Sequence, residues 1–90
     1  MNSRTVICLK HQQELKGLDD PPFPGSDGEK IYSNVSQKAW EEWLSFQTML
    51  INEKKLSLRD PDVRNYLRAQ MWHFFNNEEV DSIEGFKPES

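Results

Sequence analysis

The stretch from Ala39 to Glu53 is a dense run of large apolar residues, and it constrains the fold more than any other part of this chain. Wound as a helix, it places apolar side chains at the i, i+3, i+4 and i+7 spacing of one face. That face carries Trp40, Trp43, Leu44, Gln47, Leu50 and Ile51, and Ala39 and Phe46 widen it. Ser36 stands where an N-cap is expected. A stripe this wide is typical of packing rather than of a cofactor site, so it predicts a core helix.

Length and charge limit the classes of protein to consider. Ninety residues make one domain, spanning residues 1–90, with a modest margin of stability. With 36% hydrophobic and 29% charged residues, the composition is that of a globular chain. The net charge of -4 and the pI near 5.1 argue against a nucleic-acid-binding protein, which needs a clustered positive field.

The N-terminus does not have the form of a signal peptide. The only early apolar run is Val6–Leu9, and polar residues follow it directly. No stretch approaches the length that spans a bilayer. The single cysteine, Cys8, cannot form an intramolecular disulfide, which fits a reducing compartment. We therefore expect a cytoplasmic protein with no membrane contact.

The first twenty residues carry the signals of a β-hairpin. Arg4–Lys10 mixes β-branched and apolar residues over the length of a strand, and Glu14–Asp19 can return against it after a turn at 11–13. Alternation predicts one face with Val6 and Cys8 and the other face with residues 5, 7 and 9. A connector with three prolines, 19–25, follows the hairpin.

Two further helices are predicted. Ser26 or Asp27 can cap a short helix that ends near Val35. Asp60 followed by Pro61 is a strong start signal for a third helix that ends near 76–77. Its apolar face carries Val63, Tyr66, Leu67, Met71, Phe74 and Phe75, which we expect to pack on the core helix. From about residue 78 the acidic composition predicts a weakly ordered tail, which Ile83 or Phe86 can tether.

No catalytic constellation stands out, so we do not expect an enzyme. Cys8 is the residue with the most distinctive chemistry. It can be a thiolate favoured by Arg4 and Lys10, able to react with oxidants or to contribute a soft donor to iron. It can equally be a buried cysteine that acts as a small hydrophobe, and composition does not decide between the two.

The candidate metal ligands are few. His11 and Glu14 sit three residues apart and can offer nitrogen and oxygen to a divalent ion if the hairpin brings them together. Asp19 with Asp20 forms a hard-oxygen pair, and the acidic residues at 78, 79 and 81 form another such group. Each has an ordinary alternative, because solvated acidic residues on a protein surface are common.

Several stretches together resemble a known family. They are SRTVIC at the N-terminus, GLD followed by PPFPG, then IY, VSQKAWEEWLSFQTMLINEKKL, and DP with QM and FF. In these stretches the chain is similar to the YggX family, small bacterial proteins described as iron(II)-trafficking proteins. The resemblance covers nearly the whole chain, and QTMLINEKKL is its most specific block. The chain departs from the family pattern at LKGLDD and at PGSDGEKIY.

The resemblance implies an α+β fold in which a small N-terminal two-stranded antiparallel sheet is followed by about three helices. It also implies a non-enzymatic role in which iron(II) is the cargo, iron-sulfur cluster assembly or repair is supported, and oxidative damage to iron-sulfur proteins is limited. The lone cysteine of the family, in its TVxC setting, falls on Cys8, which favours the reactive reading in an exposed, cation-flanked strand. The family supplies no settled set of iron ligands.

Two hypotheses follow. The first is a monomeric cytoplasmic protein that binds iron(II) weakly and transiently and passes it to iron-sulfur proteins or their assembly machinery. The alternative is an adaptor without a metal, which docks on an iron-sulfur assembly or redox partner. A thiol enzyme based on Cys8 is the weakest reading, since no second cysteine is present to resolve an oxidised intermediate.

Overall fold

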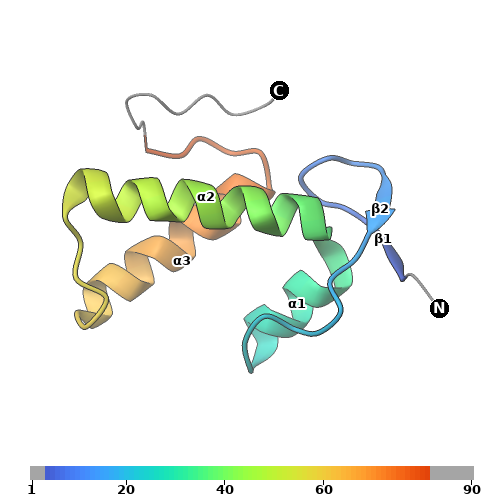
Figure 1. The fold of residues 1–90 in the computed structure, drawn as a ribbon, viewed down its shortest axis with the longest axis horizontal. Helices are drawn as coiled ribbons and strands as arrows, with labels where there is room; N and C mark the ends of the chain where they lie inside the picture. Colours follow the sequence, from blue (N-terminus) through green and yellow to red (C-terminus); the bar gives the residue numbers. More distant parts are fainter. Residues whose placement is uncertain (1–3, 82–90) are drawn as a thin grey trace. The chain divides into compact units, whose positions relative to one another are not determined.

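A computed structural model describes residues 4–81 of the chain. In chain order its elements are β1 (Thr5–Ile7), β2 (Glu14–Lys16), α1 (Ser26–Asn34), α2 (Gln37–Lys54) and α3 (Pro61–Phe75) (Figure 1). The predicted α+β fold, with a two-stranded antiparallel sheet and three helices, is therefore confirmed. The chain forms two compact units, an N-terminal unit (Met1–Glu42) and a C-terminal unit (Trp43–Ser90), and α2 contributes to both.

The hairpin is shorter than the sequence predicted. β1 and β2 pair in the register that joins Val6 to Leu15, and each strand has three residues. The segment from Cys8 to Gln13 forms the connecting loop, closed by hydrogen bonds from Cys8 N to Gln13 O (3.0 Å) and from Gln12 N to Cys8 O (2.7 Å). Val6 is buried whereas Ile7 is 68% exposed, so the predicted alternation of faces is confirmed.

Arg4 ties the start of β1 to the rest of the N-terminal unit. One guanidinium nitrogen, Nη2, donates to the backbone oxygens of Leu18 (3.2 Å) and Tyr32 (2.6 Å). The guanidinium also lies 3.6 Å from the centre of the Tyr32 ring, a cation-π contact. Gly17 completes this region, because its backbone forms an isolated antiparallel bridge with Ser36. One arginine thus links the start of β1, the segment that follows β2 and α1.

The start of α1 differs from the prediction. Its N-cap is Gly25, with φ of 98°, and no side chain accepts a hydrogen bond there, so neither Ser26 nor Asp27 caps the helix. A left-handed φ is open to glycine without strain, which explains why the helix begins one residue earlier than a side-chain cap would set it. Gly28 is buried where the chain folds back, since a Cβ built on it would lie 1.7 Å from the Phe23 carbonyl oxygen.

Helix α2 begins as the sequence indicates. The Ser36 hydroxyl accepts a hydrogen bond from Ala39 N at 3.0 Å, which confirms Ser36 as the N-cap. The buried stripe of α2 is narrower than predicted and is centred differently, because Leu44 is exposed. Its members, all almost fully buried, are Ala39, Trp43, Phe46 and Leu50.

An aromatic cluster holds the C-terminal unit together. Trp43 and Phe46 on α2 meet Phe74 and Phe75 on α3, and the closest pair, Phe46 and Phe74, stacks with ring centres 5.4 Å apart. Helix α3 runs back obliquely, and its C-terminal end approaches the middle of α2 (Figure 1). The predicted apolar pairing of these two helices is therefore confirmed.

Both ends of α3 have recognisable caps. Asp60 Oδ1 accepts a hydrogen bond from Asp62 N at 2.9 Å and Pro61 occupies the first turn, so the predicted start is confirmed. At the other end Asn77 has φ of 59°, and Glu78 N donates to His73 O at 2.8 Å, the 6→1 bond of a Schellman motif.

The described chain ends at Asp81, so the predicted tethers of the tail, Ile83 and Phe86, lie outside the described residues. Asp81 itself is held, because its backbone N–H donates to Gln70 Oε1 at 2.9 Å. Among residues 4–81, no helix combines the length and the apolar character that a bilayer crossing requires.

Candidate functional site

Four reactive side chains gather where the β1–β2 loop meets the first turns of α2. They are Cys8, Lys10, His11 and Glu42, called here the loop cluster. The closest contact joins His11 Nε2 to Glu42 Oε1 at 2.8 Å. Their side chains are 16% and 26% exposed, so the pair is half-buried. All four residues belong to the N-terminal unit.

Backbone hydrogen bonds hold the loop cluster in place. Besides the two bonds that close the loop, Leu9 N donates to Asn34 O at 2.8 Å, which ties the loop to the end of α1. Glu42 projects from a helix whose start is capped by Ser36, so the carboxylate is fixed relative to the loop. A His–Glu pair between a pinned loop and a capped helix has little freedom to separate.

Cys8 is buried, with 1% of its surface exposed, so the expectation of an exposed thiol is wrong. Its sulfur accepts a hydrogen bond from the backbone N–H of Ser36 at 3.4 Å. The start of α2 covers the thiol, and Arg4 is turned away toward the Leu18 and Tyr32 carbonyls. The thiol is therefore packed inside the N-terminal unit, in the setting of a small hydrophobe.

Lys10 brings a positive charge to the loop cluster. Burial lowers the pKa of its ammonium group, and electrostatic interactions with Glu42 and with Cys8 oppose part of that decrease. Lys10 therefore lies in the neighbourhood of both side chains. The loop cluster combines an amine, an imidazole, a carboxylate and a thiol within one region.

The structure pairs the predicted metal candidates differently from the sequence. His11 and Glu14 are not joined: Glu14 Oε2 accepts a hydrogen bond from the Thr5 hydroxyl at 2.7 Å, and His11 turns to Glu42 instead. Asp19 and Asp20 are exposed in the connector after β2. No three His, Cys, Asp or Glu side chains converge as a metal cage within the part of the chain that the structure describes.

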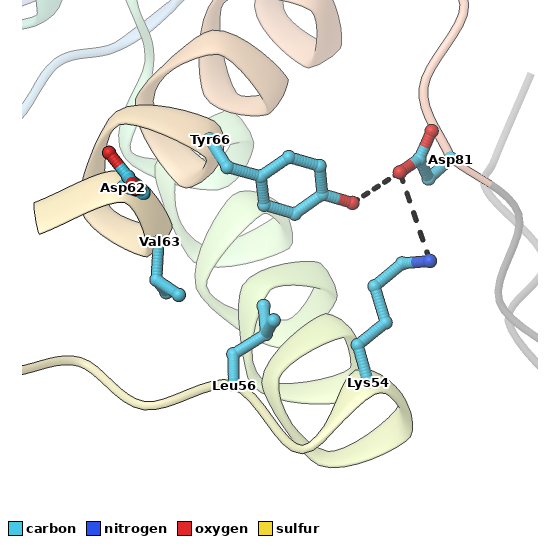
Figure 2. Close-up of a pocket in the computed structure, with 6 residues that line it drawn as sticks. All are labelled: Lys54, Leu56, Asp62, Val63, Tyr66 and Asp81. Carbon is cyan, nitrogen blue, oxygen red and sulfur yellow. Dashed lines mark hydrogen bonds and ion pairs between the residues drawn. The ribbon is translucent and has the colours of Figure 1, made fainter. Parts of the chain in front are cut away.

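The C-terminal unit holds an open pocket of about 260 Å³ (Figure 2). Its lining residues are Lys54, Leu56, Asp62, Val63, Tyr66 and Asp81. Tyr66 points from α3 toward Asp81, and its hydroxyl donates a short hydrogen bond to Asp81 Oδ2. Lys54 reaches the same oxygen from the end of α2, at 3.9 Å. Burial, the hydrogen bond to Asp81 and the charge of that carboxylate raise the pKa of Tyr66 to about 12.

The fold and the loop cluster together define the class of protein to which this chain belongs. It is a small α+β protein with a two-stranded sheet and three helices, and its N-terminal unit brings a nitrogen and an oxygen donor together beside a buried thiol. The family model described as bacterial Fe(2+) trafficking matches residues 1–89, so the chain belongs to that family.

Curated relatives are similar over nearly their whole length. A protein of Marinobacter nauticus is 60% identical over 86 residues, which cover 96% of this chain and 96% of the relative. A protein of Hahella chejuensis is 58% identical, over 96% of this chain and 97% of the relative. A protein of Acinetobacter baumannii (strain ATCC 17978) is 51% identical, over 97% and 99% respectively. Each of these is named "Probable Fe(2+)-trafficking protein".

Proposed function

We propose that this protein binds iron(II) and passes it on to other proteins. Membership of the bacterial Fe(2+) trafficking family carries the proposal, and the relatives bear the corresponding name. The loop cluster adds chemical support, because imidazole nitrogen and carboxylate oxygen are donors that iron(II) accepts. The cargo is the metal ion itself, and no reaction of a resident cofactor is needed.

Weak, transient binding is part of the proposal. A carrier that is to release its ion needs few protein ligands and coordination positions that water or an acceptor can occupy. Within residues 4–81 the candidate metal-binding side chains come in small groups: His11 with Glu42, Glu14 alone, and Asp19 with Asp20. Such groups suit exchange better than long-term storage.

Iron-sulfur proteins or their assembly machinery in the cytoplasm are the proposed recipients, and the protein acts there as a monomer without catalytic activity. Cys8 has the proposed role of limiting oxidative damage to iron-sulfur proteins. Because the thiol is buried, this role requires the N-terminal unit to open or a partner to displace the start of α2. Supply of iron and protection of clusters are then two tasks of one small protein.

Anaerobic titration with iron(II), followed by transfer to a metal-free acceptor protein, tests this function. We expect saturable binding of the ion and faster loading of the acceptor from the iron-bound protein than from free iron(II) at the same concentration. A wild-type chain with no saturable site would contradict the proposal.

The alternative function is an adaptor that docks on an iron-sulfur assembly or redox partner without carrying metal. The observation that favours it is the exposed apolar surface of the hairpin, where Ile7 is 68% exposed and Leu9, in the loop after β1, is 37% exposed. In the titration above, the adaptor predicts no saturable binding. It also predicts that Ile7→Ser weakens association with the partner, whereas an iron carrier would still bind its ion.

A further inference from the structure

Building on the iron(II) carrier function, we propose that His11 Nε2 and the Glu42 carboxylate are the two protein ligands of the ion. This assigns the metal to a pair that spans a loop and a helix, rather than to His11 with Glu14 or to Asp19 with Asp20.

The separation of the two donors suits a shared ion. Two ligands about 2.1 Å from a divalent ion and at right angles to each other lie about 3 Å apart. His11 Nε2 and Glu42 Oε1 are 2.8 Å apart, so a divalent ion can bridge them once each side chain turns its lone pair off the line that joins the two atoms and toward the ion. Loop closure at Cys8–Gln13 and capping of α2 by Ser36 already fix both donors.

The exposure of the pair suits exchange. At 16% and 26% exposed, the two side chains are shielded enough to limit competition from bulk water, yet one side stays open. An ion held there by two protein ligands keeps water in its remaining positions, and an acceptor protein can replace that water. The geometry is that of a transfer site rather than of a closed structural site.

The chain contains a matched control for this assignment. His73 and Glu78 form the second His–Glu pair of the described residues, but their nitrogen and oxygen are 3.9 Å apart and their side chains are 45% and 60% exposed. Glu14 is a second control, because it is the acidic neighbour of His11 in sequence and is bound to Thr5 instead.

The experiment is anaerobic titration of the full chain with iron(II) alone, in the wild type and in matched variants. We expect His11→Gln and Glu42→Gln to weaken binding by a factor of about 10 to 100, and His73→Gln and Glu14→Gln to leave it unchanged. Paramagnetic broadening of wild-type NMR signals should be centred on residues 10, 11 and 42.

The outcomes separate this site from the function on which it depends. No saturable binding by the wild type would overturn the carrier function. Saturable binding that persists in both His11→Gln and Glu42→Gln would overturn the site alone. If those variants do not fold, broadening of the wild-type NMR signals that is centred away from residues 11 and 42 would equally overturn the site.

Discussion

At the scale of single residues, Asp81 shows how one carboxylate can control a neighbour. It accepts the Tyr66 hydroxyl and lies 3.9 Å from the Lys54 ammonium group (Figure 2). Burial, this hydrogen bond and the carboxylate charge all disfavour the tyrosinate, which is why the pKa of Tyr66 is about 12 rather than 10.0. The last described residue is thus chemically coupled to the middle of α3.

We predict that Asp81→Asn lowers the pKa of Tyr66 from about 12 toward 10.0, because the variant removes the negative charge. The tyrosinate absorbance in the near ultraviolet, followed against pH, measures this pKa. Asp62→Asn is the control, since Asp62 lines the same pocket but does not accept the Tyr66 hydroxyl. An unchanged Tyr66 titration in Asp81→Asn would contradict the prediction.

The same shift predicts a pH dependence of stability. Folded Tyr66 holds its proton to a higher pH than unfolded Tyr66, so between pH 10 and about 12 the folded state binds more protons. The stability that protonated Tyr66 contributes to the folded state is fully present below pH 10.0 and is lost as the pH rises through about 12. The free energy of unfolding, measured by denaturant titration, should fall less steeply over this range in Tyr66→Phe than in the wild type.

Not every residue-level feature could be predicted from the sequence. His11 was a candidate from its residue type alone, but its partner Glu42 lies 31 positions away. No local pattern fixes which of two nearby glutamates a histidine in a loop will face. Composition left a buried and a reactive Cys8 equally open, and the family resemblance favoured the exposed thiol, whereas the start of α2 covers the sulfur. Side-chain pairing across elements depends on tertiary structure.

At the scale of elements, the helix signals were the most reliable part of the sequence. Two helix starts are marked by Ser36 and by Asp60 with Pro61. The side-chain oxygens of Ser36 and Asp60 accept hydrogen bonds from backbone N–H groups of the first turn, and proline has no N–H that needs a partner there. The start of α1 was misplaced because Gly25 acts through backbone freedom and leaves no side-chain signal. The strands were predicted too long, since a two-stranded ribbon has no neighbouring strand to extend its pairing.

Gly28 provides a test at this scale. A methyl group at this position would overlap the Phe23 carbonyl, which lies 1.7 Å from the built Cβ. We predict that Gly28→Ala lowers the free energy of unfolding by about 1 to 3 kcal/mol, despite the better helix propensity of alanine. Denaturant titration checks this. Ser33→Ala, at an exposed position of α1, should change stability by no more than about 0.5 kcal/mol. Equal stabilities of both variants would contradict the close approach.

At the scale of the whole molecule, α2 contributes to both compact units. Its first turns support Cys8 and Glu42, and its later turns carry Trp43 and Phe46 into the aromatic cluster. The sequence identified this helix as the centre of the fold. It did not indicate that the packing divides near residue 42, because apolar periodicity continues through that point.

The burial of Cys8 predicts a slow thiol. Its reaction with a disulfide reagent in the native protein should be slower by about 100-fold or more than in denaturant, since exposure requires local opening that costs a few kcal/mol. Because the chain has one cysteine, the released thiol chromophore reports on this residue alone. Equal native and denatured rates would show that the start of α2 does not protect the sulfur.

The arrangement of the N-terminal unit also has a consequence for protein synthesis. Every described partner of Arg4, Cys8 and His11 lies at or before residue 42. At translation rates of about 5 to 20 residues per second, the 34 residues from position 8 to position 42 take about 2 to 7 s to add. The nascent chain therefore carries the hydrogen-bond partner of its only thiol, Ser36, before the ribosome has added Phe74 and Phe75.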